Sequence, residues 1–430
     1  MLFTNIGIID ENFKYQADMT VGVQADRITY IGKEIPEDAE FFGEVYDGKN
    51  KVMLPGFYNA HGHSPMSLMR GYGENMALQD WLEKRIFPFE DKLYRKAVYW
   101  ATLLTMAESI RFGIVSTTDM YYFTDDMVRA YSVSGAKTNI CRAVTNPTGM
   151  PLDEHVGLKE MRDAIMMYDG FENGRIKVDA SAHAEYTNDI KTLRAVADCA
   201  KEFDTHVHVH LSETKREHVE CSVRYGKTPA EVMLEIGMFD QPCTAAHCVW
   251  VTDSDMDILK DKGVTVASNP ASNFKLASGI CDVPTMYRKG INVALGTDSV
   301  ASNNSLNFIE QIKLFALAGK VKSMDPAVMT PEQILFSATR AGAISQGRED
   351  SGLIKEHFKA DLIVIDASGP NMNPVHEMAN NIIYSADGKD VCLTMIDGRV
   401  CYQDGEYKTI DIEETIAEAE NAKNKILSEI

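Results

Sequence analysis

Several common sequence signals are missing from this chain. The eight cysteines include no C-x-x-C pair, which argues against a zinc ribbon or dithiol redox motif, so we expect reduced and mostly buried thiols. No run of five basic residues occurs, and the net charge of -20 argues against a nucleic-acid or anionic-membrane partner. No apolar run approaches the roughly 18 residues of a membrane span, and the first residues lack a secretion-signal pattern. A cytoplasmic protein is therefore expected.

The bulk composition is that of an ordinary globular protein. Of the 430 residues, 45% are hydrophobic and 25% are charged, which excludes disorder as the main character of the chain. The length allows one large domain or two to three smaller ones. The oligomeric state is left open, with a homo-oligomer among the alternatives.

The middle of the chain repeats one pattern, in which a helix-periodic stretch is followed by a turn and a short β-branched run. Gly113, Gly135, Gly263 and Gly290 precede four of the runs, where a left-handed residue would end a helix. Thr228-Pro229-Ala230-Glu231 and Thr330-Pro331-Glu332-Gln333 fit the capping box that begins a helix. The eight runs cover residues 54–63, 114–122, 137–144, 176–183, 205–213, 243–249, 264–270 and 292–299.

Eight strands alternating with helices predict a (β/α)₈ barrel of the α/β class, because parallel strands need helical crossovers. The alternative is an open doubly wound sheet, but that fold usually carries a G-x-G-x-x-G loop, which this chain lacks. The flanks show short alternating strands with Asp-Gly turns, typical of antiparallel hairpins. We therefore predict a small β-sandwich domain from residues 1–53 and 359–407, a barrel over 54–358, and an amphipathic C-terminal helix over 408–430.

Polar residues cluster where the predicted strands end. These ends carry His61, His63, His183, His210, Glu213, His247 and Asp298. The carboxyl ends of barrel strands meet at one mouth, so these side chains are expected to converge there. His61 and His63 are two residues apart, which places both rings on one face of a strand. His206 and His208 lie deeper along their strand and are expected to be hydrogen-bonded core residues.

Histidine nitrogens and a carboxylate without thiolates favour Zn²⁺, with Fe²⁺ as the alternative. The expected ligands of one divalent metal are His61, His63, His210 and Asp298, and the ion would turn its bound water into hydroxide near pH 7. His247 is expected to orient that hydroxide, and Glu213 to transfer protons. A second, bridged metal would usually require a carbamylated lysine at the position of His183, so one ion is expected.

Several motifs together resemble the amidohydrolase superfamily and, within it, the 5-methylthioadenosine/S-adenosylhomocysteine deaminases. They are His61-Gly62-His63, His210-x-x-Glu213, Ala246-His247-Cys248, Ser268-Asn269-Pro270-x-Ser272-Asn273-x-Lys275-Leu276, and Gly296-Thr297-Asp298 followed by Ser302-Asn303-Asn304. The resemblance implies a metal-dependent hydrolytic deaminase that converts adenosine or a 5'-modified adenosine to the inosine analogue and ammonia. The 5'-modified substrates would include 5-methylthioadenosine, S-adenosylhomocysteine and 5'-deoxyadenosine.

The same resemblance implies a set of substrate contacts. Trp81 and Glu90 would contact the nucleoside, with Glu90 bridging the ribose hydroxyls, while Arg142, His183 and Ser302 would also line the pocket. Residues 143–158 lack the second arginine of family members that take S-adenosylhomocysteine, and Glu185 stands where the family has Ser-Pro. Both departures argue against a substrate with a carboxylate-bearing tail. An amidohydrolase acting on another aminated or halogenated ring, such as guanine or an s-triazine, is the alternative function, and a non-catalytic scaffold is a third.

Overall fold

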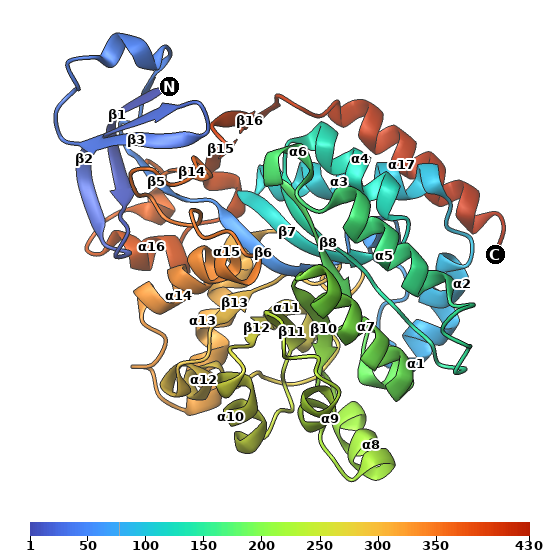
Figure 1. Ribbon diagram of the computed structural model, residues 1–430. Helices are drawn as coiled ribbons and strands as arrows, with labels where there is room; N and C mark the ends of the chain where they lie inside the picture. Colours follow the sequence, from blue (N-terminus) through green and yellow to red (C-terminus); the bar gives the residue numbers. More distant parts are fainter. Residues whose placement is uncertain (77) are drawn as a thin grey trace.

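Eight parallel strands form a nearly closed barrel at the centre of the molecule (Figure 1). The computed structural model describes residues 1–76 and 78–430. The strands follow one another in the sheet in chain order: β6 (Phe57–Gly62), β7 (Ile114–Tyr121), β8 (Lys137–Arg142), β9 (Ile176–Ser181), β10 (Val207–Leu211), β11 (Cys243–His247), β12 (Thr265–Ser268) and β13 (Val293–Leu295). Each falls within one of the eight predicted runs, so the predicted barrel is confirmed.

The last strand returns to the first at the rim of the barrel. The backbone N–H of Asp298, just after β13, donates to the carbonyl of His61 on β6 at 3.0 Å. Strands β7, β10 and β11 are buried along their whole length, since one face meets the barrel interior and the other the surrounding helices. This explains why the sequence shows nearly continuous apolar runs there rather than strict alternation.

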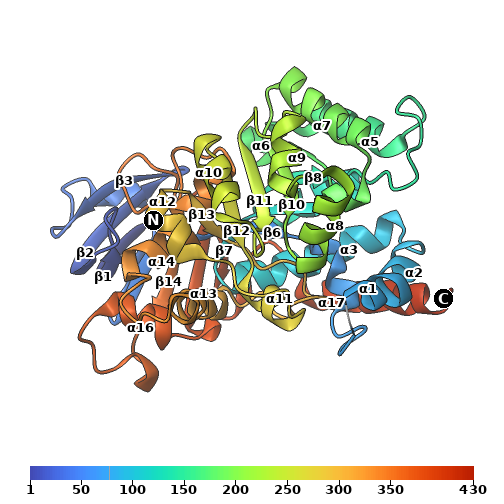
Figure 2. The same ribbon diagram turned by 90° about the horizontal axis from the view of Figure 1, so that it is seen from below.

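Helices surround the barrel (Figures 1 and 2). The longer ones are α3 (Arg95–Arg111), α4 (Thr124–Ser134), α5 (Val156–Tyr168), α7 (Ile190–Phe203), α8 (Lys215–Tyr225), α9 (Pro229–Glu235), α10 (Asp253–Asp261), α12 (Val283–Lys289), α13 (Phe308–Ser323) and α14 (Pro331–Ala338). The predicted capping boxes begin α9 at Thr228 and α14 at Thr330. Gly135 and Gly290, with φ of 82° and 75°, end α4 and α12 in the left-handed conformation, as predicted.

The two ends of the chain form one further sheet, drawn in blue and orange-red in Figure 1. Its strands are β1 (Leu2–Ile9), β2 (Tyr15–Gln24), β3 (Arg27–Gly32), β4 (Val45–Asp47), β5 (Lys51–Pro55), β14 (Leu362–Asp366), β15 (Val391–Ile396), β16 (Arg399–Gln403) and β17 (Glu406–Tyr407). The ends meet where β5 pairs antiparallel with β14. The predicted pairing of both ends is confirmed, whereas the boundaries at 53/54 and 358/359 stay a prediction; β5 itself continues to Pro55.

Buried charges attach this sheet to the barrel. The Lys137 ammonium on β8 lies 2.5 Å from Asp361 Oδ2 and 2.7 Å from Asp397 Oδ1, and the Tyr58 hydroxyl donates to Asp361. The C-terminal helix α17 (Ile412–Leu427) packs on α3, where Lys96 and Glu418 form an ion pair at 2.7 Å. These ion pairs fix the terminal sheet and the C-terminal helix to the barrel, whose strand ends are described below.

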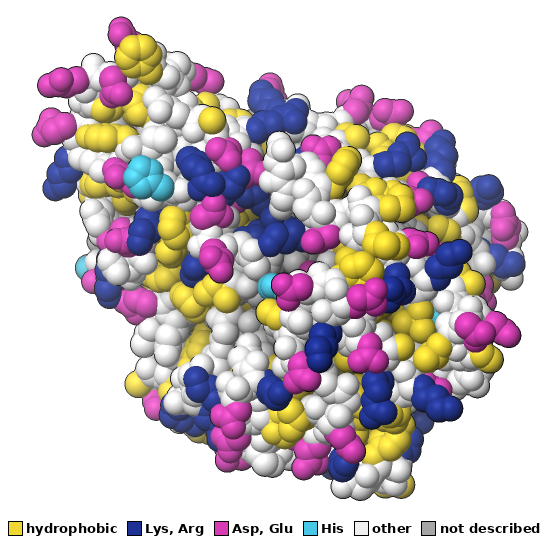
Figure 3. Space-filling view, viewed as in Figure 1, with side chains coloured by type: hydrophobic (Ala, Val, Ile, Leu, Met, Phe, Trp, Pro, Cys, Tyr) yellow, Lys and Arg dark blue, Asp and Glu magenta, His cyan; other side chains and the backbone are white. Residues whose placement is uncertain are grey.

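The surface carries both signs of charge. On the face shown in Figure 3, acidic and basic side chains are interspersed rather than segregated. In the described part of the chain, no helix is long and apolar enough to cross a bilayer.

Candidate active site

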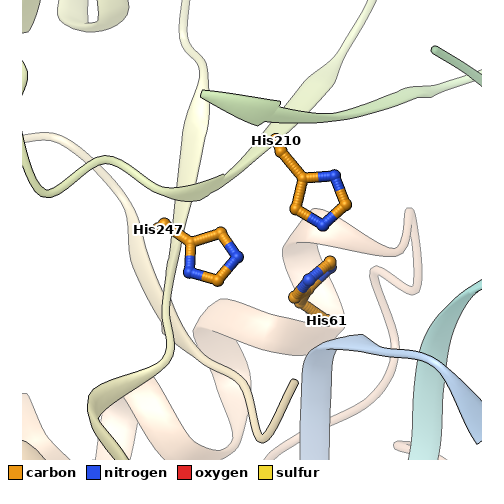
Figure 4. Close-up of side chains that lie close together, drawn as sticks. All are labelled: His61, His210 and His247. Atoms are coloured by element: carbon orange, nitrogen blue, oxygen red, sulfur yellow. The ribbon is translucent and has the colours of Figure 1, made fainter. Parts of the chain in front are cut away.

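Side chains from four strand ends converge at the barrel mouth. His61 on β6, His210 on β10 and His247 on β11 offer nitrogens that lie within 4.8 Å of one another, and so do the ligand atoms of His61, His63 and Asp298. Figure 4 shows the rings of His61, His210 and His247 directed toward a common point. The carboxylate of Asp298 lies 3.5 Å from His61 Nε2 and 3.2 Å from His63 Nε2.

The outer nitrogens of three histidines are already engaged. His63 Nδ1 lies 2.6 Å from the Met120 carbonyl and His210 Nδ1 lies 2.8 Å from the His183 carbonyl. A carbonyl can only accept, so both Nδ1 atoms carry the proton and both Nε2 atoms face inward as lone-pair donors. His61 Nδ1 lies 2.9 Å from His208 Nε2, and His61 Nε2 is buried without a hydrogen-bond partner among the described residues.

This pattern fits a divalent cation. Metal-bound histidines hold their second nitrogen through a hydrogen bond, and inward Nε2 atoms beside one carboxylate form a nitrogen and oxygen donor set. The predicted core role of His208 is confirmed by its bond to His61, and His206 Nδ1 is bonded to the Ser345 carbonyl at 3.2 Å. The structure thus brings together the four side chains predicted as ligands, and their role as ligands stays a proposal.

The protonation states also suit coordination, which requires neutral imidazoles and an ionised carboxylate. Burial lowers the pKa of His61 to about 3 and that of His210 well below its usual value. For Asp298, burial alone would raise the pKa, but the neighbouring His61 and His63 rings outweigh it and hold the pKa well below the usual range. His63 differs, since its contact with Asp298 overcomes burial and raises its pKa.

The outer oxygen of Asp298 is held by two serines. Ser272 Oγ and Ser302 Oγ both donate to Asp298 Oδ2, the latter at 3.0 Å, while the Ser299 backbone N–H donates to Oδ1 at 2.8 Å. Ser302 lies at the cavity, as predicted, but its hydroxyl is directed to Asp298. Ser272 was not predicted as a site residue, although it stands in the quoted Ser268–Leu276 motif.

His247 and Glu213 face each other across the mouth. His247 Nε2 lies 4.0 Å from Glu213 Oε2, and His247 Nδ1 is bonded to Asn273 Oδ1 at 2.9 Å. Asn273 is a second residue that sequence reasoning left without a role. Glu213 Oε1 accepts a bond from the Ser278 hydroxyl at 3.3 Å, and burial raises the pKa of Glu213 above its usual value. A carboxyl in this environment binds and releases protons closer to neutrality.

A cavity of about 100 Å³ opens beside these groups. Five of the residues predicted as substrate contacts line it, namely Trp81, Glu90, His183, Glu213 and Ser302; their contact with a substrate stays a prediction. The other described residues of its wall are His63, Met66, Leu82, Ile86, Phe87, Met120, Tyr121, Tyr122, Ala143, Tyr186, His210, His247, Leu276, Asp298 and Ser299. The wall combines apolar and aromatic side chains with three carboxylates and four imidazoles, a mixture that suits a ligand with apolar faces and polar edges.

Glu90 is a further acid of this cavity wall. It lies on α2 (Phe87–Glu90), and its carboxylate accepts a bond from the Tyr121 hydroxyl at 2.7 Å. Burial raises the pKa of Glu90 to about 7. Trp81, which is 6% exposed, is fixed by a bond from its indole N–H to the Tyr72 carbonyl at 3.3 Å.

Arg142 is the predicted contact that the structure does not bring to the cavity. Among the described residues of the wall it is absent; its guanidinium pairs with Glu160 at 2.8 Å and stacks 4.9 Å from the Tyr122 ring centroid. Glu185 is also engaged elsewhere, since Arg224 pairs with it at 2.6 Å. The following residue, Tyr186, faces the cavity instead.

Known proteins resemble this chain over nearly its full length. The model of the amidohydrolase family matches residues 52–401. A 5-methylthioadenosine/S-adenosylhomocysteine deaminase of Dictyoglomus thermophilum is 41% identical over 392 residues, which is 91% of each chain. A 5'-deoxyadenosine deaminase of Methanosarcina mazei is 36% identical over 96% of this chain and 94% of its own. An adenosine deaminase from Xanthomonas campestris, solved with bound zinc, superposes with a TM-score of 0.93 at 26% identity, covering 99% of this chain and 98% of its own.

Proposed function

This chain belongs to the amidohydrolase family, and from that premise we propose that it is a metal-dependent hydrolase of C–N bonds that deaminates adenosine or a 5'-modified adenosine. The products are the inosine analogue and ammonia. The observation that carries the proposal is the meeting of inward histidine nitrogens, Glu213 and a half-buried Glu90 around one cavity. Relatives named for adenosine-type substrates support the choice of ring.

We assign His61, His63, His210 and Asp298 as the residues that hold one Zn²⁺ ion, because all four inward atoms are nitrogen or carboxylate oxygen. When bound, the cation lowers the pKa of a water molecule toward neutrality, which makes water a nucleophile at pH 7. The ion bound to the Xanthomonas protein is zinc, which supports this choice.

The chain's own residues then move protons and orient the reactants. His247, held at Nδ1 by Asn273, presents Nε2 to the attacking water. Glu213 takes a proton from that water and passes one to the purine ring nitrogen, while the water oxygen bonds to C6. The C6–N bond then breaks as the new C6 hydroxyl gives its proton, through Glu213, to the amino group, so that ammonia leaves and a C6 carbonyl remains. Glu213 is 9% exposed, so bulk water does not compete for its proton.

Ammonia release from a panel of aminated rings tests this proposal. The panel contains adenosine, 5'-deoxyadenosine, 5-methylthioadenosine, S-adenosylhomocysteine, guanine and an amino-s-triazine. Turnover is expected for the adenosine nucleosides and not for guanine or the triazine. Turnover of guanine or the triazine alone would favour the alternative amidohydrolase function.

Replacement of Glu90 by alanine is expected to lower kcat/KM for ribonucleosides more than for 2'-deoxynucleosides. A carboxylate that accepts bonds from both ribose hydroxyls is worth about 1.5 to 3 kcal/mol, or roughly ten- to a hundredfold in kcat/KM. A 2'-deoxy analogue lacks one of these hydrogen bonds even in the wild type, so its kcat/KM should fall much less in Glu90→Ala. The measurement compares kcat/KM for adenosine and 2'-deoxyadenosine in the wild type and in Glu90→Ala; equal losses for both would contradict the ribose contact.

The same contact should depend on pH. Because the pKa of Glu90 is raised to about 7, the carboxylate predominates above that pH and the neutral acid below it. The neutral acid accepts less well, so the KM of adenosine should rise as pH falls from 8 to 6, while that of 2'-deoxyadenosine changes less. A control in Glu90→Gln should show no such difference between the two substrates.

Uncharged 5' groups are expected to be favoured over a charged tail. Arg142 is paired with Glu160 outside the cavity wall, and no second arginine stands in residues 143–158. We expect kcat/KM for 5'-deoxyadenosine or 5-methylthioadenosine to equal or exceed that for S-adenosylhomocysteine. A preference of about tenfold or more for S-adenosylhomocysteine, or more than 1.4 kcal/mol of transition-state binding, would show that a basic group reaches the tail.

A further inference from the structure

The connection that carries Glu213 is short and unusually shaped. Strand β10 ends at Leu211 and α8 begins at Lys215, so three residues reverse the chain. The first of them, Ser212, has a left-handed φ of 47° although it is not glycine. Such a backbone persists only when neighbouring groups hold it in place.

One buried side chain holds the whole connection. Glu217, which is 4% exposed, accepts the backbone N–H of Ser212 through Oε1 at 2.7 Å and that of Glu213 through Oε2 at 2.7 Å. The same Oε2 lies 3.5 Å from the N–H of Thr214, whose hydroxyl in turn accepts the N–H of Glu217 at 3.1 Å. The carboxylate therefore binds three successive backbone groups around the Glu213 Cα.

The side chain of Glu213 has little support of its own. Its only hydrogen bond among the described residues is the 3.3 Å contact from Ser278, and His247 Nε2 is 4.0 Å away. The direction in which the Glu213 carboxyl points is therefore set by its backbone. Charged acceptors bind N–H groups more strongly than neutral ones, so the ionised form of Glu217 suits this role.

We propose that Glu217 is a positioning residue for the deamination reaction: its carboxylate clamps the Ser212–Thr214 backbone and thereby aims Glu213 at the substrate. This inference rests on the proposed function, because it needs Glu213 to be the proton carrier. It makes Glu217 more than a helix cap.

The chain provides matched controls for the capping part of the role. Thr228 and Glu231 form the same box at the start of α9, with the Thr228 N–H 2.7 Å from Glu231 Oε2. There the Glu231 side chain is exposed, and no residue next to the box lines the cavity. At α10, the shorter Asp255 still reaches the N–H of Thr252 at 2.7 Å. An aspartate at position 217 should therefore still accept the N–H of Thr214, but its shorter side chain should not reach the N–H of Ser212.

The test measures kcat, KM, metal content and melting temperature of zinc-loaded protein with 5-methylthioadenosine. Glu217→Gln places an amide donor against backbone donors and should lower kcat by about 10- to 100-fold, as expected for a misplaced catalytic group, with KM changed less than about threefold. Glu217→Asp should melt near the wild type and still lose at least about tenfold in kcat. Glu231→Gln should keep kcat within about twofold, because its box positions no reacting group.

Folded Glu217→Gln and Glu217→Asp variants with wild-type kcat would overturn the proposal. Variants that lose their metal or fail to fold would equally count against it, because Glu217 would then stabilise the folded chain and not orient the Glu213 carboxyl. A wild-type protein that releases no ammonia from any adenosine nucleoside would refute the proposed function, and is distinguishable from these outcomes.

Discussion

Removal of the metal is expected to abolish deamination while the chain stays folded. The ligand atoms of His61, His63 and Asp298 lie within 4.8 Å of one another, as do those of His61, His210 and His247, and without a cation the attacking water keeps a pKa far above neutrality. Several kcal/mol of transition-state stabilisation would be lost, which corresponds to at least about a 10³-fold fall in kcat/KM. The barrel does not depend on the ion, because its strands are paired and buried independently of the site.

The measurement combines metal analysis, chelation and re-addition of Zn²⁺. The purified chain should contain about one equivalent of metal, and activity should return with zinc. His210→Ala should lose metal and activity together. His206 lies four residues before His210 and is bonded to the Ser345 carbonyl, so His206→Ala should keep both the metal and the activity. Two tightly bound equivalents, or full activity after chelation, would contradict the assignment of a single essential ion.

Glu213→Gln is expected to retain metal and nucleoside binding but to lose most of the rate. An amide cannot accept and release a proton, and general acid–base catalysis contributes about 10²- to 10⁴-fold. Burial raises the pKa of the Glu213 carboxyl above its usual value, which favours proton uptake by this group, whereas glutamine cannot accept a proton at any pH. The measurement is kcat and KM with 5-methylthioadenosine between pH 6 and 9, together with metal content.

Glu220→Gln on α8 is the matched control. Its side chain is 45% exposed and paired with Arg216, away from the cavity wall, so the same chemical change should leave kcat unaltered. A Glu213→Gln variant with near-normal turnover across this pH range would show that Glu213 only supports His210 and transfers no proton.

The sequence predicted the frame of the molecule because local rules apply there. Buried parallel strands are short and β-branched, and the turns before them carry glycines that end helices, as Gly135 and Gly290 do. Once the barrel was assumed, the mouth followed from geometry, since residues at the carboxyl ends of strands must meet. That is why His61, His210 and Asp298 could be brought together without any knowledge of their distances.

The directions of side chains away from the strand ends could not be predicted. Arg142 stands at the end of β8, yet its long side chain turns to Glu160, which follows it by 18 residues on a helix. Ser272 and Asn273 lie on the short α11 (Pro270–Lys275), and only the tertiary structure shows that they bind Asp298 and His247. Such contacts depend on how the helices pack against the barrel rim, and the hydrophobic periodicity of the sequence does not reveal that packing.

Hydrolytic deamination is tested by product analysis after incubation of zinc-loaded protein with 5-methylthioadenosine in oxygen-18 water. We expect one ammonia for each nucleoside consumed and a product that is the inosine analogue, with one oxygen-18 at C6 and the ribose and thioether intact. Adenosine nucleosides that remain unchanged, while guanine or a halogenated triazine is hydrolysed, would contradict this expectation.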